Sequence, residues 1–87
     1  MKWNDISEWQ PGERRDAPNR LHIEGQLCRL VIGHDRRFGI WWTSIGASAR
    51  LVLAAQTVEE AKREAITRMQ ERLEKMLSEV HQMKDAS

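Results

Sequence analysis

The residues from Val58 to Met83 include neither proline nor glycine, the two residues that most often interrupt a helix. Thr57 stands just before them and is a good N-cap, because its hydroxyl can accept a hydrogen bond from a backbone amide of the first turn. Glu60, three residues after Thr57, completes a capping box. We therefore predict one helix over about 58–83, on the order of 39 Å long at 1.5 Å per residue.

This helix is too long for the rest of the chain to cover. The chain has 87 residues, which is enough for one domain. Strands of six to eight residues span only roughly 20–27 Å. A sheet of such strands leaves the distal half of the helix uncovered, so the side chains of that half indicate what packs there.

The distal half carries an apolar stripe. Its members follow one another in alternating steps of three and four residues: Ile66, Met69, Leu73, Met76, Val80 and Met83. Such heptad spacing is typical of a helix that packs on another helix. The alternative is packing on the chain's own sheet, since any amphipathic helix shows these steps. Because the helix exceeds the sheet in length, we favour a homodimer interface, or a docking face for another protein.

Between Arg20 and Ala55, short apolar segments alternate with turn-type sequences. The segments read RLHIEG, QLCRLVIG, RFGIWWTSIG and ARLVLAA. We predict an antiparallel meander of three or four strands followed by the long C-terminal helix, which is an α+β fold. Residues 20–87 form this single sheet-plus-helix domain.

The segment 1–19 differs from the rest of the chain. Trp3, Ile6 and Trp9 recur every three residues, which fits one side of a short helix. The sequence PGERRDAPN follows and marks a loop, because it combines two prolines, a glycine and four charges. We therefore predict an N-terminal arm, or a short helix plus a loop, ahead of the domain.

Composition narrows the classes of function. The net charge is +1, so the chain as a whole does not attract nucleic acid or membranes strongly. No apolar run approaches the roughly 20 residues that a membrane span needs. The first residues lack the apolar stretch of a signal peptide, and the single cysteine cannot form an internal disulfide. We expect a reduced cytoplasmic protein that does not bind a membrane.

No group of residues indicates catalysis. The sequence has no glycine-rich phosphate loop, no paired-cysteine motif and no nucleophile elbow. His22, Cys28 and His34 are the one trio with metal-binding side chains, but their spacing matches no zinc pattern. We predict a protein that is not an enzyme and that uses no metal or cofactor.

Trp41 and Trp42 stand side by side in a predicted strand, where neighbouring side chains point to opposite faces. Phe38, Ile40 and Trp42 make up the bulkier face, so we assign that face to the core. Trp41 then lies on the open face of the sheet. Three things can cover Trp41 there: the N-terminal segment, a second copy of the chain, or a target protein, for which tryptophan is a typical anchor.

Arginines make up the rest of the predicted partner-binding set. With Trp41, this set consists of Arg14, Arg15, Arg29, Arg36, Arg37 and Arg50. A sheet face with tryptophan and arginine can also stack bases and contact phosphates. Acidic residues stand among these arginines and weaken the net field, so nucleic acid is the alternative partner and a protein is the favoured one.

The part from about Gln26 to Met69 runs through strands, the sequence IWW, and then TVEEAKREA at the start of a helix. This outline resembles small accessory proteins of temperate phages and prophages, among which anti-CRISPR proteins inhibit host systems. It also resembles the three-strand-plus-helix DNA-binding domain at the start of many tyrosine integrases, in which the sheet enters the major groove. The mixed charges of this chain depart from the strongly basic sheet of that second group.

The resemblance implies a mobile element and the cytoplasm of a bacterial host cell, and it assigns no binding residues. We therefore expect a non-enzymatic dimer that binds a host protein or ribonucleoprotein complex. It would inhibit a host defence complex by steric occlusion, through Trp41, the Arg36–Arg37 hairpin and the arm. The alternatives are a nucleic-acid-binding module that uses the same sheet face, and a structural dimer whose long helix organises an assembly.

Overall fold

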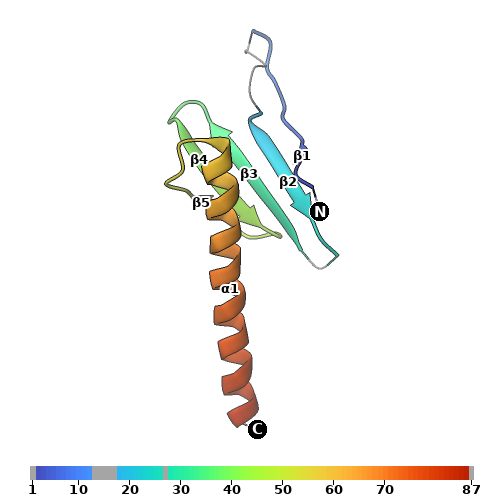
Figure 1. Cartoon of the computed structure of the whole chain (residues 1–87), viewed down its shortest axis with the longest axis vertical. Helices are drawn as coiled ribbons and strands as arrows, with labels where there is room; N and C mark the ends of the chain where they lie inside the picture. The colour runs from blue at the N-terminus through green and yellow to red at the C-terminus, as the bar shows by residue number, and fades with distance from the viewer. Residues whose placement is uncertain (1, 13–17, 27, 87) are drawn as a thin grey trace.

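The computed structural model of the chain describes residues 2–12, 18–26 and 28–86. A five-stranded antiparallel sheet is followed by one long C-terminal helix, which confirms the predicted α+β class (Figure 1). The elements are β1 (Asn4–Asp5), β2 (Arg20–Glu24), β3 (Arg29–Asp35), β4 (Ile40–Ile45), β5 (Leu51–Val52) and α1 (Val58–Ala86).

The sheet is a meander in which each strand pairs with its neighbour in the chain, in the order β1-β2-β3-β4-β5. The long strands β2, β3 and β4 correspond to the segments expected from the sequence. The two edge strands have two residues each, which is too short for an alternating pattern to be recognised. The meander therefore has five strands where three or four were predicted.

The N-terminal segment forms an arm along the edge of the sheet. Its residue Asn4 pairs with His22 of β2, and the amide of Ile6 donates to the carbonyl of Arg20 at 3.0 Å. Residues 2–12 contain no helix. The short-helix alternative was therefore wrong, since the spacing of Trp3, Ile6 and Trp9 belongs to an extended segment.

The start of α1 follows the predicted cap. The amide of Glu60 donates to the Thr57 hydroxyl at 3.2 Å. The Glu60 carboxylate in turn accepts from the amide of Gln56 at 2.9 Å, one residue before the N-cap. Both contacts satisfy amides that have no partner within the helix, so the capping signal sets the first residue of α1 at Val58.

The first half of α1 crosses one face of the sheet over β3 and β4 (Figure 1). Ala61 and Ala65 are fully buried there, and their small side chains let the helix approach the strands closely. The sheet side of this core comes from all the strands from β2 to β4 and from the chain after β5: Leu21, Leu30, Ile32, Trp41, Leu53 and Ala55.

Trp41 belongs to this core, and its side chain is only 6% exposed. The assignment of Trp42 to the core face and of Trp41 to the open face was therefore wrong. The alternation of the strand allows either assignment, and the bulk of one face does not decide between them. Phe38 did not contribute to that bulk, because it lies in the turn before β4 and is 73% exposed.

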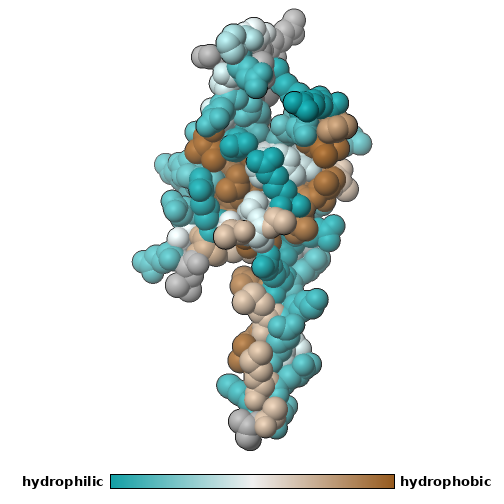
Figure 2. All heavy atoms as spheres, turned by 180° about the vertical axis from the view of Figure 1, so that it is seen from behind, coloured by the Kyte–Doolittle hydropathy of each residue, from teal (hydrophilic) through white to brown (hydrophobic). Residues whose placement is uncertain are grey.

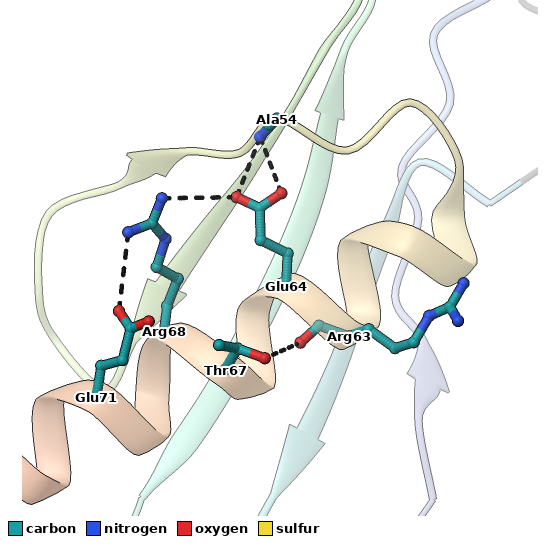
Figure 3. A network of polar contacts seen from close by, with 6 residues as sticks. All are labelled: Ala54, Arg63, Glu64, Thr67, Arg68 and Glu71. Carbon is teal, nitrogen blue, oxygen red and sulfur yellow. Dashed lines mark hydrogen bonds and ion pairs between the residues drawn. The ribbon is translucent and has the colours of Figure 1, made fainter.

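Glu64 ties α1 to the chain that follows β5 (Figure 3). Its carboxylate oxygens accept from the amide of Ala54 at 2.9 and 3.1 Å. One of these oxygens also pairs with the guanidinium of Arg68 at 3.8 Å, and Arg68 reaches Glu71 at the same distance. These contacts hold the β5 side of the sheet to the helix.

The second half of α1 extends beyond the sheet. Every residue from 70 to 86 is exposed, and the molecule measures 59 × 25 × 19 Å. Its radius of gyration is 15.6 Å, whereas a compact chain of this length has a value of about 12 Å. The expectation that the sheet cannot cover the whole helix is confirmed.

Candidate functional site: the open face of the sheet

The face of the sheet opposite α1 is organised by a row of paired residues that crosses four strands. In this row Gly33 pairs with Arg20 on one side and with Trp42 on the other, and Trp42 pairs in turn with Val52. Paired residues on neighbouring strands point to the same face. The missing side chain at Gly33 therefore leaves room between Arg20 and Trp42.

The indole ring of Trp42 fills that room by lying across β3. A Cβ atom added at Gly33 would overlap with the ring, so the indole rests directly on the backbone of that strand. The guanidinium of Arg50 covers the ring at 3.9 Å from its centroid, and that of Arg20 lies 5.6 Å away. Trp42 is therefore only 8% exposed. It serves as a support for two arginines and is not a free stacking surface.

A third arginine, Arg29, lies on the same face. Its guanidinium nitrogens are 2.8 and 3.2 Å from Nδ1 of His22. Arginine has no acceptor atom, so it donates to the imidazole. The contact holds the side chain of Arg29 over β2.

The three arginines meet around a hollow of about 250 Å³. Trp42, Val31 and Ile6 supply apolar parts of its wall. Among the described residues, none that lines this hollow carries a carboxylate. A hollow with three guanidinium groups and no acidic group is suited to an anion.

A larger hollow of about 720 Å³ adjoins it on the side of the β3–β4 hairpin. Arg20, Trp42 and Arg50 line both hollows. The larger one also has arginines from the hairpin, Arg36 and Arg37, and its walls include the carboxylates of Glu8 and Asp35. Of the two hollows, the smaller one is therefore better suited to an anion.

The hairpin arginines are held at the rim by local contacts. The amide of Arg37 donates to the Asp35 carboxylate at 2.9 Å, which shapes the turn. The guanidinium of Arg36 lies 5.6 Å from the ring centroid of Trp9, so it connects the hairpin to the N-terminal arm. Gly39 closes the hairpin with a φ of 63°, a conformation that glycine adopts without strain.

The sheet arginines differ from Arg68 of α1 in their partners. On α1, Arg68 forms ion pairs with two glutamates. Within the part of the chain that the structure describes, no ion pair is formed by Arg20, Arg29 or Arg50. Their charges face solvent on the open side of the sheet and are available to a ligand.

The structure brings together four of the predicted partner-binding residues on the open face and its rim: Arg29, Arg36, Arg37 and Arg50. Trp41 does not join them, because it packs beneath α1 against the ring of His34 at a centroid distance of 4.9 Å. Arg14 and Arg15 lie outside the described residues. The predicted partner-binding set did not include Arg20 or Trp42, although a glycine in the middle of β3 is a signal for the close approach of another group.

The structure also shows where the six residues of the predicted helix face lie. Ile66 and Met69 lie near the sheet, and Met69 is half-buried against the core. The other four members lie on the free half of α1, where they are 46–67% exposed: Leu73, Met76, Val80 and Met83. Leu77 is exposed beside them.

The residues that could hold a metal ion do not converge. His22 lies on the open face, His34 contacts Trp41 on the helix face, and Cys28 is exposed at the start of β3. In residues 2–12, 18–26 and 28–86, no group of three or more histidine, cysteine or acidic side chains is placed to hold a metal. Within those ranges, no helix has the length and apolar character that a membrane crossing requires.

Comparison with known proteins does not identify a family for this chain: no family model, no curated protein and no solved structure matches it.

Proposed function

We propose that the protein is a non-enzymatic binding module whose open sheet face engages the phosphate backbone of a nucleic acid. The observation that supports this proposal is the hollow in which Arg20, Arg29 and Arg50 converge without an acidic residue among its described walls. Phosphate oxygens match the planar, forked donors of a guanidinium. Cationic contacts to phosphates supply most of the affinity in sequence-independent binding.

The contact between the Arg50 guanidinium and the Trp42 ring also favours the binding of a phosphate. A guanidinium stacked on an indole at 3.9 Å has already lost much of its rotational freedom. It therefore loses less entropy when it binds a phosphate.

The spread of the cations favours a polymer over a small anion. Arg36 and Arg37 lie at the rim of the larger hollow, which shares three residues with the smaller one. A ligand with repeated phosphates can contact both groups of arginines at once. Glu8 and Asp35 also line the larger hollow, and their negative charges limit the range of the attraction that the arginines exert. Binding is therefore expected to be sensitive to salt.

Inhibition of a host protein complex, which the resemblance to phage accessory proteins implies, stays a prediction. In that hypothesis Trp41 was the exposed anchor for the protein partner. Since Trp41 packs in the core, the hypothesis now depends on the arginines alone, and these suit phosphates at least as well.

The test is fluorescence anisotropy with labelled oligonucleotides of one sequence, as duplex DNA, single-stranded DNA and RNA, over a series of salt concentrations. The variant is Arg29→Gln, and the matched control is Arg63→Gln on the exposed side of α1 (Figure 3). We expect Arg29→Gln to weaken binding about tenfold, as a lost charge-assisted hydrogen bond of about 1.5 kcal/mol would. The slope of log K against log salt should fall by about 1, with no change for Arg63→Gln.

Two results would overturn the proposal. One is the absence of a salt-dependent anisotropy change with all three oligonucleotides at low salt. The other is equal weakening by the Arg29 and Arg63 substitutions, which would indicate attraction by overall charge. Recovery of a stoichiometric protein partner from a nuclease-treated bacterial lysate, lost with Arg29→Gln, would then support the inhibitor hypothesis.

A further inference from the structure

We infer that the apolar stripe on the free half of α1 is the interface of an antiparallel homodimer in which two copies of the helix lie side by side. Leu73, Met76 and Val80 are about half exposed on a helical segment that the sheet does not reach. Figure 2 shows apolar side chains running along the part of α1 that extends past the sheet. A helical segment of this length is marginal in water by itself, so a partner must cover its apolar side.

The stripe continues the side of α1 that packs on the sheet. Met76 and Met83 follow Ala65 by about three and five full turns, so they lie on the same line of the helix as this buried residue. Near the sheet, Lys62 approaches the ring of Trp3 at 6.0 Å, so this side of the helix faces the β1 edge. A second helix would therefore lie beside α1 on the side of the β1 edge.

The spacing of the stripe is self-complementary when the two helices run in opposite directions. Ile66 of one copy then faces Met83 of the other, and Met69 faces Val80. Leu73 faces Met76 at the centre. Every member of the stripe has an apolar partner in this register, in alternating layers of the kind found in coiled coils.

The charged residues beside the stripe favour this register over the other antiparallel registers. Arg72 and Glu79 border the stripe on the same side, and these borders face each other in an antiparallel pair. In the register described, Arg72 of each copy faces Glu79 of the other. A shift by one heptad in either direction places Arg72 against Arg72, or Glu79 against Glu79. Both shifts also reduce the apolar layers from six to four, so packing and the ion pairs favour the same register.

A parallel pair is disfavoured by the residues that precede the stripe. In a parallel dimer the seam would extend from Ile66 back to Lys62 and Glu59, each facing its own copy. Two like-charged pairs would then lie between the helices at the level of the sheet. In the antiparallel pair the apolar layers finish where Ile66 meets Met83, and Lys62 and Glu59 remain outside.

The experiment is multi-angle light scattering of the full chain at micromolar concentrations, followed by charge exchange. We expect a mass of twice 10.2 kDa for the unchanged protein. Arg72→Glu alone, or Glu79→Arg alone, creates two like-charged contacts and should raise the dimer dissociation constant about tenfold. The double variant restores both pairs with reversed polarity and should return the constant to within about threefold of the unchanged value.

Leu73→Glu with Met76→Glu should give a monomer whose helix content, measured by circular dichroism, is unchanged or falls only beyond the sheet. The matched control is Ser78→Glu with Gln82→Glu, on the opposite side of α1, which should remain dimeric. A monomer for the unchanged protein would overturn the inference. A dimer whose affinity the double charge exchange fails to restore would also overturn it, because a parallel pair does not bring Arg72 and Glu79 together.

Discussion

At the scale of single residues, the open face depends on the absence of a side chain at Gly33. Because β3 has no side chain there, the indole of Trp42 lies across the strand and brings Arg20 and Arg50 to the same ring. Any larger residue would displace the ring, and both arginines would lose their support.

We expect Gly33→Ala to lower the free energy of unfolding by about 1–3 kcal/mol, as overpacking typically does. The backbone at this position is not strained, since Gly33 is not among the glycines with positive φ. Urea denaturation would measure the change. In a Trp42→Leu background, which removes the ring, Gly33→Ala should lower the free energy of unfolding by clearly less. Equal costs in the two backgrounds would contradict the contact.

The N-terminal arm contains a second local interaction, between Asp5 and Ser7. The hydroxyl and the amide of Ser7 hold the pKa of Asp5 below its usual value of 3.8, because they stabilise the charged carboxylate. A depressed folded-state pKa contributes stability above the unfolded value and loses it as the pH falls through the folded value. We therefore expect the arm to loosen in acid below about pH 4.

A carboxyl-detected NMR titration would follow Asp5 directly, with its midpoint expected below 3.8. The Ser7 amide resonance should shift over the same range of pH. An Asp5→Asn variant should show no such transition. A midpoint at or above the usual value would contradict the role of Ser7.

At the scale of elements, α1 has two halves with different supports. The first half is fixed by its cap, by the buried alanines and by the bond from the Ala54 amide to Glu64. The second half has no contact with the sheet. The same helix therefore packs on the sheet with its first half and exposes an apolar surface on its second half.

We expect Glu64→Ala to lower the free energy of unfolding by about 1 kcal/mol, because the Ala54 amide loses its acceptor and Arg68 loses a partner. Hydrogen exchange should become faster at Ala54 than elsewhere in the sheet. Glu71→Ala is the matched control, since Glu71 pairs with Arg68 at the same distance as Glu64 does. Unchanged exchange at Ala54 would show that the bond is not made in solution.

The sequence predicted those parts of the fold whose signals are local. Thr57 and Glu60 predict the first residue of α1, and the structure confirms it. The faces of β4 could not be derived in this way, because alternation separates Trp41 from Trp42 without saying which of them meets the helix. The deciding contact is with Gly33, a partner nine residues away on another strand.

At the scale of the whole molecule, the two proposed surfaces lie apart. The arginine hollow is on the sheet face opposite α1, and the stripe is on the free half of the helix. In an antiparallel dimer the two sheets lie at opposite ends of the helix pair. The assembly would therefore present two open faces to one long nucleic acid.

This arrangement predicts a dependence on oligonucleotide length, which combines the two proposals. The unchanged protein should bind a long duplex at least tenfold more tightly than a short one, because the second face binds from a high effective concentration. The Leu73→Glu, Met76→Glu variant should bind both with similar affinity per site. Anisotropy with two duplex lengths measures the ratio, and equal ratios for both proteins would contradict simultaneous binding by two faces.

The meander order of the strands also has a kinetic consequence. Each strand pairs with its neighbour in the chain, and the helix packs on the two strands that form the central hairpin. Contacts between residues close in sequence need little loop closure, and small proteins dominated by them fold quickly. A nascent chain could therefore complete its sheet as soon as β5 and the first turns of α1 are made, well before a second copy is needed.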